Sequence, residues 1–235
     1  IGTYALTTED TGSRVVAIGF GALANANNDS DNYNIAIGYN AGNSITTGKF
    51  NNIIGANAGD ALTIGTRNVA IGYNALSSED EHGRNIAIGH NALFAQDAGA
   101  DAYNVAIGYD AGVSVTTGAY NTLIGGLAGD ALTTGSENIA IGYAALSTED
   151  GNGKNVAIGV NALEDLNAGA DAYNIAIGHD AGRNVSTGVN NVLIGGEAGD
   201  AITTGNYNIA IGKSALSTED GHGRNVGIGY AALNV

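Results

Sequence analysis

Residues 34–38 read Asn-Ile-Ala-Ile-Gly, and this pentapeptide is the unit from which the rest of the sequence is built. Its two isoleucines lie two positions apart, so in an extended chain they share one face while the alanine between them points the other way. β-branched residues favour strands, and no apolar stripe at helical spacing accompanies them. The pentapeptide therefore predicts a short β-strand that ends at a glycine.

The Ile-Gly dipeptide recurs 14 times at regular spacing, with an alanine three positions after each glycine. From Gly19 onward, one longer interval between glycines is followed by three shorter ones. This order begins again at Gly89, Gly159 and Gly229, which gives a longer period of about 70 residues. Units of about 17–19 residues cannot enclose a core alone, so the units must stack. We predict an all-β, parallel β-solenoid of about 14 short coils, in which residues 1–235 are one continuous array within a longer protein.

Apolar residues indicate how each coil is filled. The Val/Ile pairs of the repeated strand are expected to be buried against the coils on either side. A second apolar segment follows some seven residues after the glycine in half of the units, and it predicts a second short strand and two turns per coil. This segment is marked by Ile45, Leu62, Val115, Leu132, Val185 and Ile202.

An asparagine stands four residues before the glycine in almost every unit, and Val15 is the one exception. Stacked coils would place these amides in a ladder in which each bonds to the next, as in other stacked β assemblies. Because they recur in every coil, we assign them a structural role. The ladder comprises Asn34, Asn51, Asn68, Asn85, Asn104, Asn121, Asn138, Asn155, Asn174, Asn191, Asn208 and Asn225.

Composition and motifs exclude several classes of function. Eight Lys and Arg against 23 Asp and Glu give a net charge of −15, which would repel nucleic acids and anionic membranes. The chain has no cysteine for disulfides or thiolate sites, and no apolar run long enough to span a bilayer. No nucleophile, phosphate-loop or zinc-protease motif is present. The histidines do not follow the repeat, since Asn152 replaces His82 one period later. We therefore predict a non-enzymatic protein with no catalytic or cofactor-binding residue.

Acidic residues recur with the longer period. Glu-Asp pairs begin at residues 9, 79, 149 and 219, and a further aspartate recurs in the coil that follows the first three. Oxygen-rich loops on adjacent coils suit Ca²⁺, which takes six to eight oxygen ligands. The alternative is a solvated acidic surface that keeps molecules apart. The candidate calcium ligands are Glu79, Asp80, Asp101, Glu149, Asp150 and Asp171.

Aromatic residues often follow the Ile-Gly glycine and would form a broken column along the stack. Tyr39, Tyr73, Tyr109 and Tyr143 are candidate surface contacts in this column. One interpretation is a surface that stacks on sugars or meets another protein. The other is packing between coils that shields the glycine turn.

The repeated Asn-Ile/Val-Ala-Ile-Gly-x-x-Ala motif resembles the head repeat of trimeric autotransporter adhesins, the YadA-type head. Similar arrays occur in phage tail fibres and bacterial surface fibres. The resemblance covers essentially the whole chain, although these units are longer than those of the family and lack its serine. It implies a left-handed parallel β-roll in which three chains pack their Val/Ile faces around a common axis, outside a bacterial cell or virion, with a role in adhesion.

These observations lead us to expect an extracellular structural or adhesive fibre segment that presents binding surface from a bacterial cell. The alternatives are a phage tail-fibre shaft that recognises a host glycan and a self-assembling matrix filament. The expected partners are further copies of the chain, as a homotrimer or a head-to-tail filament, and a host glycan or surface protein. Loops that vary between copies, at 24–32, 94–102 and 164–172, would carry the contacts.

Overall fold

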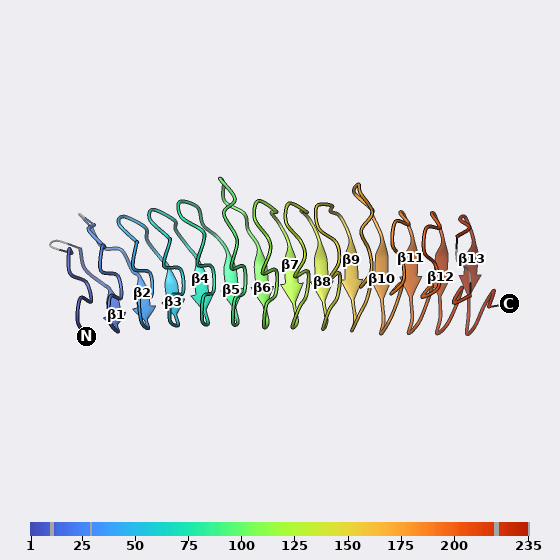
Figure 1. Cartoon of the computed structure of the whole chain (residues 1–235), viewed down its shortest axis with the longest axis horizontal. Helices are drawn as coiled ribbons and strands as arrows, with labels where there is room; N and C mark the ends of the chain where they lie inside the picture. Colours follow the sequence, from blue (N-terminus) through green and yellow to red (C-terminus); the bar gives the residue numbers. More distant parts are fainter. Residues whose placement is uncertain (10–11, 29, 219–220, 235) are drawn as a thin grey trace. The chain divides into compact units, whose positions relative to one another are not determined.

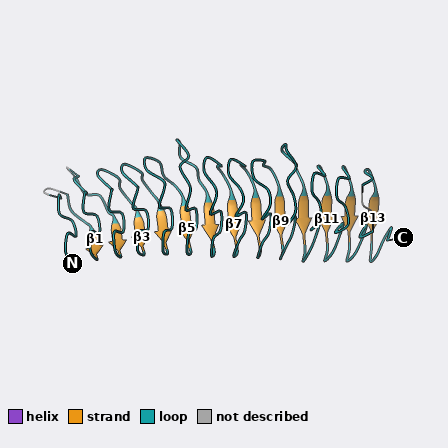
Figure 2. Ribbon diagram, viewed as in Figure 1, coloured by secondary structure: helices purple, strands orange, loops and turns teal. Residues whose placement is uncertain are grey.

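The computed structural model describes residues 1–9, 12–28, 30–218 and 221–234. The chain forms two compact units, Ile1–Ala119 and Tyr120–Val235. The described residues contain 13 strands of three residues each and no helix (Figures 1 and 2). In the same residues, nothing helical is long and apolar enough to cross a membrane. The predicted β-solenoid class is confirmed.

Six strands make up the sheet of the first unit. They pair in chain order, parallel and in register, so that Val16 lies beside Ile35 and Ala17 beside Ala36. The first Ile-Gly copy, at Ile1, precedes them and forms no strand. The strands are β1 (Val16–Ile18), β2 (Ile35–Ile37), β3 (Asn52–Ile54), β4 (Val69–Ile71), β5 (Ile86–Ile88) and β6 (Val105–Ile107).

Seven strands make up the sheet of the second unit, with the same parallel pairing in chain order. Each coil contributes one strand, as the repeat of the pentapeptide predicts. The strands are β7 (Thr122–Ile124), β8 (Ile139–Ile141), β9 (Val156–Ile158), β10 (Ile175–Ile177), β11 (Val192–Ile194), β12 (Ile209–Ile211) and β13 (Val226–Ile228).

The central residue of each strand faces the core. Ala36 is completely buried, whereas Ile35 and Ile37 on either side of it are only half-buried, and Ile53 is buried in the same way within β3. The prediction that the Val/Ile pairs are buried is therefore wrong. Successive residues of a strand point to opposite faces, so the flanking residues are left outside. The inward position holds alanine in most coils and a larger residue in β3, β7 and β11.

The second apolar segment fills the core without forming a strand. Ile45 and Leu62 are fully buried, as are their four counterparts, but none of them lies in a strand. Each occurs in a coil that has glycine four residues after the Ile-Gly glycine, where other coils have a buried leucine such as Leu23. At one such glycine, Gly42, an added Cβ would lie 3.0 Å from the Cδ1 atom of Ile45. The two arrangements thus fill the same space.

Reversals of the backbone explain why the second strand does not form. Most coils contain three residues in the left-handed region, such as Asn74, Leu76 and Arg84, in addition to the glycine. The chain between them is too short for an extended run. The Ile-Gly glycine is required by the stacking itself, because Gly72 has φ +138° and an added Cβ would lie 2.2 Å from the carbonyl oxygen of Gly89.

Candidate functional site

The ladder asparagines lie in register along each unit, and all but Asn225 are buried. The Oδ1 atom of Asn34 accepts a hydrogen bond from the backbone N–H of Asn51 at 2.9 Å. The same bond links successive coils as far as Asn104 in the first unit, and it links the coils of the second unit in the same way. The ladder therefore joins each side-chain amide to the next main chain, and the amide-to-amide bond that we had expected is also found between Asn155 Nδ2 and Asn138 Oδ1, at 3.3 Å.

The other half of each amide holds a turn in place. The Nδ2 atom of Asn68 donates to the carbonyl oxygen of His82 at 3.1 Å, and that of Asn138 donates to the carbonyl oxygen of Asn152 at 3.0 Å. Asn85 differs, because its Nδ2 atom is buried without a hydrogen-bond partner. Asn155 holds the same place in the second unit, and its Nδ2 atom donates to the carbonyl oxygen of Gly153 at 3.2 Å.

The turns held by Asn68 and Asn138 each contain one of the acidic pairs. In the first unit Glu79 is fully buried, and its Oε1 atom accepts the N–H of His82 at 3.1 Å. The Nδ1 atom of His82 lies 3.6 Å from the same oxygen. The Oε2 atom of Glu79 is buried and accepts no hydrogen bond. Burial raises the pKa of Glu79, while the N–H of His82, the His82 ring and, from beyond hydrogen-bond distance, the N–H of Ala98 offset part of that rise.

The corresponding turn of the second unit satisfies its glutamate completely. Glu149 is also fully buried. Its Oε1 atom accepts the backbone N–H of Asn152 at 3.1 Å and the side-chain Nδ2 of the same residue at 2.8 Å. Its Oε2 atom accepts the N–H of Ala168 at 3.4 Å. Asp150 beside it is exposed.

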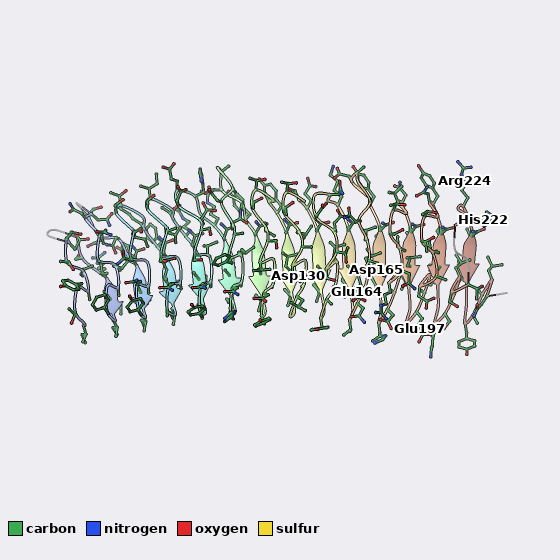
Figure 3. All side chains as sticks on the ribbon, viewed as in Figure 1. Asp130, Glu164, Asp165, Glu197, His222 and Arg224 are labelled. Carbon is green, nitrogen blue, oxygen red and sulfur yellow. The ribbon has the colours of Figure 1, made fainter. Side chains whose placement is uncertain are left out.

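The two outer acidic pairs are described only in part. Glu9 accepts the N–H of Gly12 at 2.6 Å, so its carboxylate also closes a turn. Asp10, Glu219 and Asp220 lie outside the described residues. Among the labelled side chains of Figure 3, His222 and Arg224, which follow the last of these pairs in the sequence, lie toward the upper edge of the second unit, and Glu197 lies at its lower edge.

Asp101 lies one coil after Glu79 and is bound to a basic residue. Its Oδ2 atom is 2.7 Å from Arg84 Nη1, and its Oδ1 atom accepts the N–H of Gly83 at 3.1 Å. The guanidinium also contacts the hydroxyl of Tyr103 and lies 5.2 Å from the centre of its ring. Asp101 therefore closes the far side of the turn that holds Glu79.

Asp171 has the same arrangement in the second unit. Its Oδ2 atom accepts a hydrogen bond from Lys154 Nζ at 2.6 Å, and the ammonium lies 5.3 Å from the centre of the Tyr173 ring. The hydrogen bond from Lys154 lowers the pKa of Asp171 and raises that of Lys154. Sequence reasoning missed these basic partners, although Arg14, Arg84, Lys154 and Arg224 recur with the longer period.

The six candidate calcium ligands do not all come together. Among the described residues, one group of three acidic or histidine side chains has ligating atoms within 4.8 Å of one another, and it consists of Glu79, Asp80 and His82. Asp101 and Asp171 are bound to cations of the protein itself. Calcium binding by the six-residue set stays a prediction.

The tyrosines of the aromatic column are exposed, and in the first unit they stack. Tyr39 stacks on Phe20 with ring centres 5.5 Å apart, and His90 lies between Tyr73 and Tyr109 at 5.3 Å from each. Stacked neighbours cover ring faces and leave mainly the edges in water, which favours the interpretation as packing between coils. In the second unit Tyr143 is 56% exposed. Its counterparts in the adjacent coils are glycine and valine, so its ring faces are not covered in this way.

Comparisons with models of protein families, with curated proteins and with solved structures find no match for this chain. The resemblance to YadA-type heads stays a prediction.

Proposed function

We propose that this chain is a non-enzymatic structural segment of an extracellular fibre on a bacterial surface, in which copies of the chain associate through their strands and longer loops make adhesive contacts. The observation that carries this proposal is the Val/Ile face, defined as the first and third residues of the strands. Val16 and Ile18 in the first unit and Ile139 and Ile177 in the second are 37–41% exposed. Apolar side chains repeated in this way mark sites of contact with another protein.

A second copy of the chain is the partner that best fits this face. No described strand residue carries a charge, although the whole chain has a net charge of −15. Copies can therefore meet at this face without bringing carboxylates together, whereas other faces would repel. Parallel strands repeat about every 4.8 Å. Another copy has apolar residues at the same interval, so its Val/Ile face can pack against this one over many coils.

The hydrogen bonds between coils support a mechanical role. Each coil is joined to the next by its strand and by the asparagine ladder, so that bending a unit would stretch buried bonds in a low-dielectric interior. The loops 94–102 and 164–172 extend beyond their neighbours after β5 and β9 (Figure 1). Added Cβ atoms at Gly99 and Gly169 would meet nothing within 4 Å. These loops have the room to make adhesive contacts.

Light scattering coupled to size exclusion tests the association. One chain has a mass of 23.4 kDa, and we expect a multiple of that mass, three chains if the arrangement is that of YadA-type heads. Threonine keeps the β propensity but removes apolar area, so the double variant Ile86→Thr/Ile139→Thr should shift the mass toward a single chain. Ile64→Thr is the matched control, because Ile64 is 48% exposed but lies outside the strands. A wild-type chain that keeps the mass of a single copy at every concentration would refute the proposal.

A further inference from the structure

We propose that Glu79, Asp80 and His82 form a binding site for a divalent transition-metal ion of the Zn²⁺ type. This inference is independent of the proposed fibre function, because it concerns one turn on one chain. The three side chains offer two carboxylates and one imidazole, with ligating atoms within 4.8 Å of one another. Imidazole with carboxylate suits Zn²⁺ and its neighbours, whereas Ca²⁺ and Mg²⁺ prefer oxygen ligands throughout.

The buried, unpartnered oxygen of Glu79 is the observation that points to a ligand. Glu79 is fully buried, and its Oε2 atom accepts no hydrogen bond. The Nδ1 atom of His82 is likewise buried without a hydrogen bond, and it lies 3.6 Å from Glu79 Oε1. Leaving such groups unsatisfied is costly. Two ligands of a tetrahedral zinc ion lie about 3.3 Å apart, since each bond is about 2.0–2.1 Å. The observed separation is close to this.

The turn that carries the three residues is fixed on several sides. Asn68 donates to the carbonyl of His82 at 3.1 Å, and Asp101 accepts the N–H of the next residue, Gly83, at 3.1 Å. The carbonyl of Asp80 accepts the N–H of Thr63 at 2.6 Å. Ligands held by such bonds lose little freedom when a metal binds. Asp80 is accessible to solvent, which gives the ion a path of entry.

The second unit contains a matched turn without the imidazole. There Asn152 replaces His82, and its amide donates to Glu149 while Ala168 supplies a donor to the other oxygen. The carboxylate is satisfied by hydrogen bonds, and the described residues of this turn form no group of three ligands. The histidine of the first unit thus supplies the third ligand that the matched turn lacks.

Equilibrium dialysis of the full chain against Zn²⁺, followed by metal analysis, tests this inference. The parent chain for all variants carries His222→Asn. This change removes a second possible site, because the sequence repeats Glu, Asp and His at positions 219, 220 and 222. We expect one ion per parent chain, and His82→Asn should lower the affinity about tenfold or more. His90→Asn is the matched control: its Nδ1 atom also lies 3.6 Å from a carboxylate, that of Asp110, but it belongs to the exposed aromatic column. It should leave binding unchanged.

The matched turn of the second unit provides a check that the His82→Asn variant folds, and a variant that should gain a second Zn²⁺ site. His82→Asn should fold normally, since asparagine occupies this place at Asn152, and circular dichroism verifies that. Zn²⁺ should raise the unfolding temperature of the parent but not of His82→Asn. Asn152→His should add a second equivalent of Zn²⁺. Equal binding by the parent and His82→Asn, tighter binding of Ca²⁺ that ignores His82, or no gain with Asn152→His would each overturn the inference.

Discussion

The turns at 77–84 and 147–154 occupy the same place in the repeat, yet their buried glutamates have different partners. The sequences differ at four of eight positions, and the backbone bonds that fix the turns are the same. Glu149 has a donor at each oxygen, whereas Glu79 has one oxygen without any. The comparison teaches that the stacked backbone sets the turn, while the residue at position 82 or 152 decides whether an imidazole or a side-chain amide faces Oε1 of the buried carboxylate.

The largest expected loss of stability comes from replacing the glycine that both turns share, Gly83 in the first unit and Gly153 in the second. An added Cβ at Gly83 would lie 1.8 Å from the carbonyl oxygen of Thr66, and one at Gly153 would lie 2.0 Å from that of Ser136. Neither backbone can yield without breaking the stack, so each alanine variant should lose about 3 kcal/mol of unfolding free energy. Urea unfolding followed by circular dichroism measures this.

The control for these variants lies in the same turn. At Gly151 an added Cβ meets only Thr134 Oγ1, at 3.4 Å, and Glu81 already occupies this position in the first unit. Gly151→Ala should change the unfolding free energy by less than about 0.5 kcal/mol. A loss equal to that of Gly153→Ala would show that close stacking does not fix these turns.

A somewhat smaller loss of unfolding free energy is expected when a ladder asparagine is replaced by alanine. Asn68→Ala and Asn138→Ala each leave a buried N–H and a turn carbonyl without partners, at a cost of about 2–3 kcal/mol. Asn85→Ala should cost about 1 kcal/mol less, because the Nδ2 atom of Asn85 has no partner to lose. Thermal and urea unfolding of the three variants give the order. Equal losses in all three would contradict the role of Nδ2 in holding the turns.

The sharpest test of the comparison replaces each carboxylate by its neutral isostere. Glu149→Gln puts an amide among donors and should cost about 2 kcal/mol. Glu79→Gln should cost less than about 1 kcal/mol, since burial already opposes the charge and one oxygen has no donor. Both are measured by urea unfolding in the presence of a chelator. If Glu79→Gln proved the more damaging change, the two turns would not differ as described.

The smallest loss of unfolding free energy is expected when an ion pair beside one of the turns is removed. Lys154 lowers the pKa of Asp171 below its ordinary value of 3.8, so the folded state favours the charged form. The stabilisation is present above that value and is lost as the pH falls through the folded pKa. Because both groups are exposed, Asp171→Asn should cost less than about 1 kcal/mol at pH 7.

The pH dependence of that variant is read from paired unfolding curves. The difference between wild type and Asp171→Asn should shrink toward zero as the pH falls from about 5 to about 2, and added salt should reduce it at neutral pH. Asp101→Asn, which removes the 2.7 Å pair with Arg84, is the matched variant in the first unit. A difference that grows on acidification would contradict the pairing.

Much of the fold followed from the sequence because stacking demands repetition. The spacing of the Ile-Gly glycines predicted the parallel strand that ends at each glycine, since a clash such as that between Gly72 and Gly89 admits no other residue in the column. The second strand predicted for each coil does not form in the described residues. The inward face was not predicted. Hydrophobicity favoured the isoleucines, but the alternation of the strand turns the residue between the flanking pair inward, which is Ala36 in β2 and Ile53 in β3.

The site was predictable only in part. The period identified the acidic turns. It did not identify the pairing of Asp101 with Arg84, because these residues belong to successive coils and meet only when the second coil stacks on the first. His82 was set aside because it breaks the repeat. That break distinguishes the two turns at Oε1, where an imidazole stands in place of the amide that donates to Glu149. The other oxygens differ through the backbone, since Ala168 donates to Glu149 Oε2 whereas Glu79 Oε2 accepts no hydrogen bond.

The asparagine ladder also gives the stack a direction of growth. In every bond the acceptor belongs to the earlier coil and the donor to the later one, as with Asn34 and Asn51. During synthesis from the N-terminus, each finished coil therefore exposes an acceptor before the matching donor has left the ribosome. The nascent chain can add coils one at a time onto a preformed template, and the contacts that guide each addition reach no further along the sequence than the length of one coil.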